Sequence, residues 1–297
     1  MKKKFLLLSI FATGILLFQA CDYVRNANPP PSTSGTTGST TSPGVVYRKV
    51  LIEDYTGHKC GNCPAAAREL RRLDSLYPGK IIPMAVHAGF YANVTPSSNP
   101  PYPTDLRSVA GTDYDNTFGN SALGNPNGLV SRLGYGSANF IQQWTNWGSC
   151  AASMDTMKAD FKIDIGSTYS AGSNQVTATV TVTALVAKTS GLYNLVVLLT
   201  EDSIIAEQID YSLTGNQYVS NYKFDHVLRK AVNNSWGDSL FYNNVNINDV
   251  KTKTYSNFQL SSSWKHQHCH LVVFVYDADP SSASHYEVMQ VEMKDVN

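Results

Sequence analysis

The chain reads Tyr55-Thr56-Gly57-His58-Lys59-Cys60-Gly61-Asn62-Cys63-Pro64. Cys60 and Cys63 form a Cys-x-x-Cys pair between an apolar, strand-like run over residues 50–55 and a helix-like run over residues 65–76. At such a junction, unpaired backbone N–H groups and the positive end of the helix dipole favour a thiolate over a thiol. The stretch therefore predicts a reactive cysteine presented at an accessible helix tip.

The neighbouring segments extend this pattern into a strand–helix–strand unit. We expect residues 45–55 to form the first core strand and residues 60–77 to form a helix, which Pro78-Gly79 ends. Residues 81–87 are apolar and predict a second buried strand, parallel to the first through a right-handed crossover. This arrangement places the cysteines at the carboxyl edge of a sheet.

The N-terminus has the pattern of a secretory signal. Three lysines at positions 2–4 precede an apolar run over residues 5–18, which is shorter than the roughly 20 residues that span a bilayer. A cysteine directly after the expected cut resembles a lipobox. We therefore expect residues 1–20 to be removed and Cys21 to carry lipid, whereas the alternative is ordinary cleavage with Cys21 an incidental thiol.

Composition restricts the choice of partners. Residues 21–44 hold the lipidated Cys21 and then a stretch rich in Pro, Ser, Thr and Gly, which predicts a flexible tether. Without the three lysines of the signal, 20 basic and 23 acidic side chains remain. That balance favours neither nucleic acid nor an anionic lipid surface as a partner.

The strand, Cys-x-x-Cys and helix resemble the active site of the thioredoxin superfamily. Asp54 lies six residues before Cys60, where that family has a buried acid. Residues 125–130 resemble the turn that carries a cis-proline, here Pro126, and faces the two sulfurs. The resemblance implies a thioredoxin-like domain with catalytic roles for Cys60, Cys63, Asp54 and Pro126.

The roles that follow are those of thiol–disulfide exchange. Cys60 is expected to attack a partner disulfide as a thiolate, and Cys63 to resolve the mixed disulfide. Lys59 and the helix N-terminus would stabilise the thiolate. Asp54, buried below the sulfurs, would have a raised pKa and shuttle the proton of Cys63. Pro126 would hold backbone acceptors near the partner chain.

A narrower resemblance combines the lipoprotein signal with two blocks, Glu53-Asp54-Tyr55-Thr56-Gly57 and Cys60-Gly61-Asn62-Cys63-Pro64. Together they resemble the outer-membrane-protein-28-related lipoproteins of Gram-negative bacteria. This resemblance implies a protein anchored by lipid to the outer membrane, on its periplasmic or its cell-surface face, and we expect it to cover the whole mature chain.

The remainder of the first domain is less regular. An insertion is expected near residues 89–121, rich in proline at its start and ending in a short helix near 106–118. It would either wall the sulfur site with aromatic side chains or have no role. We expect a strand over 129–133, a hairpin-like turn over 134–137 and a closing helix over 139–161, whose aromatic and Met residues read as core.

From residue 162 the apolar pattern changes to period two. The expected strands span residues 175–186, 192–200, 225–232, 254–260, 270–276 and 288–293. Several strands without an intervening helical pattern indicate an antiparallel sandwich. The sequence thus predicts an α/β thioredoxin-like domain over 45–161, followed by an all-β immunoglobulin-like sandwich domain over 162–297.

The cysteines and histidines outside the motif raise two questions, disulfide pairing and metal binding. An exported chain meets oxidising surroundings, and the proximity of Cys60 to Cys63 favours a disulfide between them. Cys150 and Cys269 would then bridge each other or stay buried as thiols. His266, His268 and His270 would share one face of a strand opposite Cys269. Because no fourth ligand is evident, we read this as a polar outer face, and we expect neither a metal nor a cofactor.

Two hypotheses follow for function. The first is a thiol–disulfide oxidoreductase that acts on extracytoplasmic protein thiols or disulfides, and it requires an accessible Cys60 with Pro126 beside the sulfurs. The second is a non-enzymatic surface or periplasmic binding lipoprotein, for a protein or glycan ligand, in which Cys60–Cys63 is a structural disulfide. A reduction potential of the Cys60–Cys63 disulfide below about −300 mV would mean that the bond resists reduction, and would favour the second hypothesis.

Overall fold

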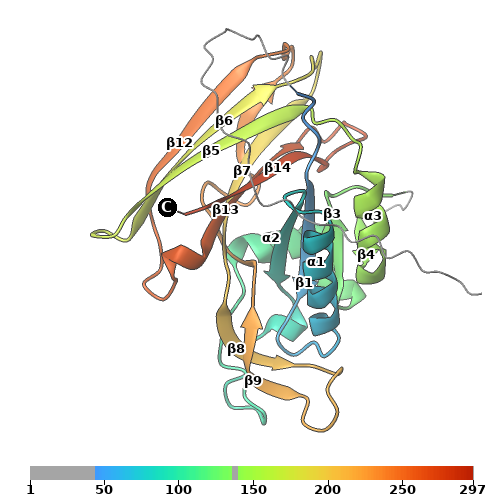
Figure 1. Cartoon of the computed structure of the whole chain (residues 1–297), viewed down its shortest axis with the longest axis vertical. Helices are drawn as coiled ribbons and strands as arrows, with labels where there is room; N and C mark the ends of the chain where they lie inside the picture. Colours follow the sequence, from blue (N-terminus) through green and yellow to red (C-terminus); the bar gives the residue numbers. More distant parts are fainter. Residues whose placement is uncertain (1–43, 136–139, 297) are drawn as a thin grey trace, which may run out of the picture. The chain divides into compact units, whose positions relative to one another are not determined.

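Strand β1 (Val50–Thr56) is buried along its whole length and lies inside a nine-stranded sheet. It pairs in parallel with β2 (Ile81–His87), and helix α1 (Cys63–Leu76) connects the two strands (Figure 1). The predicted parallel pair is confirmed. The helix begins three residues later than expected, because the backbone N–H of Cys60 donates to the carbonyl of Gly57 and holds a turn there. Cys60 therefore lies in the turn before the helix.

This computed structural model describes residues 44–135 and 140–296. The expected signal peptide, the lipidated Cys21 and the tether up to residue 43 lie outside the described residues, as does the end of the turn expected over 134–137. No helix in the described part of the chain is long and apolar enough to cross a membrane.

Helices cover both faces of the sheet around β1. Helices α1 and α3 (Trp147–Ser153) share an apolar cluster with one face, and α2 (Val109–Phe118) packs on the other. The short helix expected near 106–118 is confirmed as α2. Strand β3 (Asn127–Val130) pairs antiparallel with β1 and with β4 (Ile141–Gln143).

The helix expected over 139–161 is wrong for most of its length. Ile141 pairs with Leu129, so the start of that segment forms β4 and extends the sheet beyond β3. The helix that follows spans only seven residues, Trp147–Ser153. Spacing of aromatic and Met side chains alone predicted a longer helix, and strand pairing overrides that weak preference.

The same sheet continues with strands from the C-terminal half, in the order β14-β13-β7-β10-β2-β1-β3-β4. β10 lies beside β2 because the N–H of Ala85 donates to the carbonyl of His226 and Val227 pairs with Ala85. These strands are β7 (Leu192–Glu201), β10 (Val227–Ala231), β11 (Asp238–Tyr242), which pairs with β7, β13 (Cys269–Asp277) and β14 (Val288–Asp295). Residues 45–297 form one compact unit, so the boundary predicted at residue 162 marks a change of strand pattern and not a gap between two units.

A three-stranded sheet packs on β7, β13 and β14 through a shared apolar core. Its strands are β5 (Phe161–Ser170), β6 (Gln175–Ala184) and β12 (Val250–Gln259). The predicted alternation along β6 is confirmed, because its valines and alanines are buried while its threonines face outward. Strands β5 and β11 were not expected from the sequence.

A separate hairpin contains β8 (Ile204–Ile209) and β9 (Tyr218–Phe224). Among the described strands these two pair only with each other, and Figure 1 shows them apart from the larger sheets. At the base of the hairpin, Ala206 and Phe224 pack against Leu106. Nothing in the sequence pattern predicted this element.

Candidate redox site

The strand register gathers polar side chains on the face of the sheet that α1 covers. Asp54 pairs with Ala85, and Thr56 pairs with His87 at the ends of β1 and β2. Because side chains alternate along a strand, these four residues share one face. All four line a cavity of about 30 Å³ together with Cys63. The parallel strands therefore place an acid and a histidine at one small space, and the start of α1 adds Cys63.

Cys60 and Cys63 are joined in a disulfide, with Cα atoms 5.4 Å apart. The predicted disulfide is confirmed. The expectation of an accessible Cys60 is wrong for this structure, since Cys60 is 3% and Cys63 2% exposed. In this conformation both cysteines are almost entirely covered.

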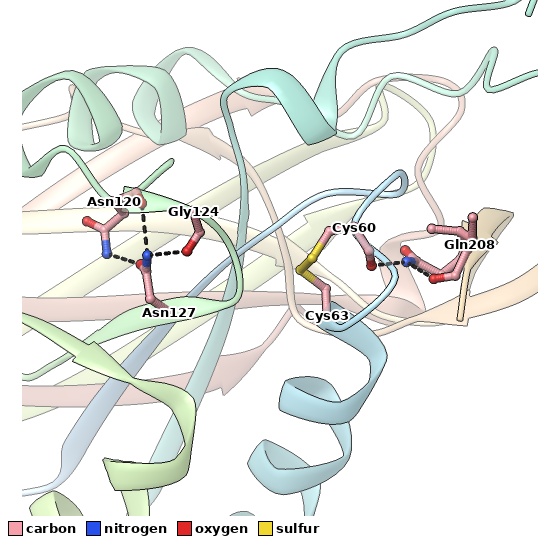
Figure 2. Close-up of a disulfide and its surroundings, with 7 residues drawn as sticks. Cys60, Cys63, Asn120, Gly124, Asn127 and Gln208 are labelled. Carbon is pink, nitrogen blue, oxygen red and sulfur yellow. Dashed lines mark hydrogen bonds between the residues drawn. A yellow bond between two sulfur atoms is a disulfide. The ribbon is translucent and has the colours of Figure 1, made fainter. Parts of the chain in front are cut away.

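The β8–β9 hairpin binds the backbone of the cysteine turn. Figure 2 shows Gln208 beside the cysteine turn, where its side-chain Nε2 donates to the carbonyl of Cys60 at 2.9 Å. The N–H of Tyr211 donates to the carbonyl of Gly61, also at 2.9 Å. The Tyr211 ring lies so close to Gly61 that a Cβ on that residue would be 2.4 Å from it. A side chain at residue 61 would therefore force the Tyr211 ring or the cysteine turn to shift.

Asp54 is buried as predicted, and burial raises its pKa to about 8. Its Oδ1 atom has no hydrogen-bond partner among the described residues. At neutral pH the carboxyl group is mostly protonated and able to donate a proton. Its proton-shuttle role stays a prediction.

The peptide bond between Asn125 and Pro126 is cis, as the sequence resemblance implied. The next residue, Asn127, pairs with Tyr55 near the end of β1, so Pro126 lies at the end of β1 from which the cysteine turn leaves. Asn127 stabilises the turn that contains Pro126, because its side-chain amide donates to the carbonyls of Asn120 and Gly124 (Figure 2).

The side chain of Lys59 lies over an aromatic ring. Its Nζ lies 4.9 Å from the centroid of the Phe90 ring, and partial burial lowers its pKa. The proposed stabilisation of the Cys60 thiolate by Lys59 stays a prediction. Its neighbour His58 is buried and stacks on Tyr102, with ring centroids 5.1 Å apart.

The remaining cysteines and histidines have structural contacts. Cys150 and Cys269 are buried thiols, which decides between the two possibilities left open. The expected strand face of three histidines is wrong, because residues 266–268 form a short 3₁₀ helix before β13. His266 stacks on Tyr169, while His270 lies between Asp202 and Asp295. Within the described residues, no group of three or more His, Cys, Asp or Glu is placed to hold a metal.

Sequence reasoning missed three residues of this site, His87, Gln208 and Tyr211. His87 had a usable signal, because the carboxyl ends of two adjacent parallel strands lie at the same edge of a sheet. Gln208 and Tyr211 had none, since about 150 residues separate them from the cysteine turn and only the folded chain joins them.

A family model for the outer membrane protein Omp28 matches residues 112–297. This chain belongs to the Omp28 family. It is accordingly an outer-membrane protein. The match covers β3 to β14 and leaves out β1, α1 and β2, so it does not itself carry the cysteine pair.

Solved structures resemble this Omp28-family protein at low sequence identity. HBP35 of Porphyromonas gingivalis is 16% identical, with a TM-score of 0.58 over 85% of this chain and 76% of that one. A domain of the outer membrane lipoprotein Omp28 from Porphyromonas gingivalis is 24% identical, with a TM-score of 0.30 over 47% of this chain and 89% of that one. The first likeness concerns the fold alone. A search of curated proteins finds no match.

Proposed function

We propose that this Omp28-family protein is a lipid-anchored thiol–disulfide oxidoreductase whose site is closed by the β8–β9 hairpin in the oxidised state. Its substrates are thiols or disulfides of extracytoplasmic proteins. The strand–helix–strand unit, the antiparallel β3 and β4 and the cis-Pro126 support a thioredoxin-like arrangement of residues 45–161. The two-layer packing of the C-terminal strands supports an immunoglobulin-like sandwich.

The observation that carries this proposal is the buried Asp54. An unpaired carboxyl group in the interior destabilises a fold, and such costs concentrate at functional sites. A disulfide that served only as a covalent link would gain nothing from an acid placed beside it. The shared cavity of Asp54 and Cys63 supports a proton donor for the departing Cys63 sulfur.

The proposed reaction oxidises a dithiol of the partner. Once the hairpin has moved aside, a partner thiolate attacks Sγ of Cys60, a new S–S bond forms and the Cys60–Cys63 bond breaks. Cys63 leaves with the electron pair and takes the proton of Asp54. The second partner thiol returns a proton to Asp54 and attacks the mixed disulfide, and Cys60 leaves as a thiolate that takes a proton from solvent. The partner ends as a disulfide and the two cysteines as thiols.

The test compares the full chain with Cys60→Ser. We expect the wild type to have a reduction potential above about −300 mV and to exchange with dithiol and disulfide substrates, while Cys60→Ser does neither. In cells, the free Cys60 of Cys63→Ser would attack the disulfide form of the partner and release its second thiol, and the mixed disulfide that remains would identify the substrate. A potential well below that value, with equal activities for wild type and Cys60→Ser, would contradict the proposal.

A second candidate is a non-enzymatic binding lipoprotein with a structural disulfide, the other hypothesis from the sequence. The burial of both cysteines favours it, because a covered disulfide resists exchange. The same measurement of the reduction potential separates the two functions.

A further inference from the structure

The cavity that Cys63 lines also contains two buried polar side chains, Asp54 and His87. His87 closes β2 and lies diagonally across from Asp54, two residues further along the neighbouring strand. It is 2% exposed, and its ring makes an edge contact with Phe224 of the hairpin. Neither ring nitrogen has a hydrogen-bond partner among the described residues.

Buried polar atoms without partners are costly unless water pairs with them. The Oδ1 atom of Asp54 and both ring nitrogens of His87 are such atoms, and both residues line the same cavity. Its volume of about 30 Å³ exceeds the roughly 10–15 Å³ that one water requires. The cavity therefore has both the room and the polar partners for water between Asp54 and His87.

The charge state of His87 allows its ring to form hydrogen bonds with a water between Asp54 and His87. Burial, with smaller effects from His58 and Arg229, lowers the pKa of His87 to about 3, so its ring is neutral at physiological pH. A neutral imidazole has one donor and one acceptor nitrogen. It can thus orient a water that accepts the proton of Asp54. The other ionisable side chains lining the cavity are Arg71, Tyr222, Lys223, Asp225 and His226.

We infer that His87 is a positioning residue, which through cavity water directs the proton of Asp54 toward Cys63. The inference rests on the proposed function, because the proton is consumed only when the disulfide bond breaks. His87 gives up no proton in this scheme. It supplies the hydrogen bonds that hold the water in place between the carboxyl group and the sulfur.

The first experiment titrates the Asp54 carboxyl by ¹³C NMR in the oxidised full chain, where no redox activity is needed. His87→Phe removes both nitrogens and dries the cavity, so the pKa of Asp54 should rise by about one unit. His87→Asn keeps a donor and an acceptor and should restore the wild-type titration. His58→Phe is the matched control, since His58 is also buried but lies outside the cavity lining and bonds to the carbonyl of Asn93.

The second experiment measures the rate of reduction by dithiothreitol between pH 6 and 10, divided by the thiolate concentration of the reagent. We expect His87→Phe to lower this rate about tenfold, as Asp54→Asn does, with no further loss in the double variant. An unchanged Asp54 titration in His87→Phe would overturn the inference. If the titration moves but no variant or wild type exchanges disulfides, the bridge between Asp54 and His87 stands and the proposed function fails.

Discussion

At the scale of single residues, the Asp54 carboxyl is buried, its Oδ1 has no partner among the described residues, and burial raises its pKa from the ordinary 3.8 to about 8. The folded state therefore binds a proton that the unfolded state releases above about pH 4. The carboxyl group disfavours folding increasingly as pH rises from about 4 to about 8, and the effect is then constant.

This predicts that Asp54→Asn stabilises the protein in a pH-dependent way. We expect little difference in the free energy of unfolding at pH 4 and a gain of a few kcal/mol at pH 8, measured by urea denaturation of the oxidised protein. Asp164→Asn, at a half-exposed carboxylate on β5, is the control and should change stability by less than about 0.5 kcal/mol. Equal gains at both pH values would contradict the raised pKa.

At the scale of the element, the β8–β9 hairpin binds the backbone of the cysteine turn. It is a two-stranded sheet that pairs with no other described strand, and isolated hairpins are only marginally stable. Its hold on the cysteine turn consists of a few hydrogen bonds and the Tyr211 ring against Gly61. Such an element can open without unfolding the sheet.

We predict that Tyr211→Ala speeds the reduction of the Cys60–Cys63 disulfide by dithiothreitol. The missing ring uncovers Gly61 and weakens the closed state by about 1–2 kcal/mol, which corresponds to a roughly tenfold faster rate. Tyr242→Ala removes another exposed tyrosine, on β11 outside the hairpin, and should leave the rate unchanged. A rate for Tyr211→Ala equal to that of wild type would show that the hairpin does not control access.

At the scale of the whole molecule, side chains from both halves of the chain enclose one buried ion pair. Arg132 donates to both carboxylate oxygens of Glu53 at 2.8 and 2.9 Å, and neither side chain is exposed. Tyr114 of α2 lies 4.6 Å from the guanidinium, and Phe274 of β13 lies 5.1 Å from it. The pair therefore depends on the C-terminal strands that share the sheet.

We predict that Arg132→Met destabilises the protein by about 3–5 kcal/mol, because it leaves the Glu53 carboxylate buried without its partner. The double variant Glu53→Gln/Arg132→Met should recover much of this loss. Lys162→Met, which breaks a half-exposed pair with Asp164, should cost less than about 1 kcal/mol. Guanidinium denaturation measures the free energy of unfolding of all three variants. A loss below about 1 kcal/mol for Arg132→Met would contradict the prediction.

Local patterns predicted the elements whose stabilising contacts lie close in sequence. The apolar runs around the cysteine pair predicted β1, α1 and β2, and the alternation of residues 175–186 predicted β6, because side-chain periodicity is a property of a short segment. The cis bond before Pro126 followed from the family resemblance of residues 125–130, and the disulfide followed from the proximity of the two cysteines.

Errors arose where a distant partner decides the conformation. Residues 141–143 form a strand because β3 offers them a sheet edge, and residues 204–224 form a hairpin whose inner face meets the cysteine turn. Neither partner can be read from the segment itself. The predicted exposure of Cys60 failed for the same reason, since the residues that cover it lie about 150 positions away.

The sequence by itself determined the cysteine pair between a strand and a helix, with an acid six residues before the first cysteine. Only the tertiary structure decided that the pair is covered, that His87 joins Asp54 in one cavity, and that strands from both halves form a single sheet. The motif follows from the covalent spacing of residues along the chain. The covered disulfide, the shared cavity and the single sheet depend on burial and strand pairing between remote segments.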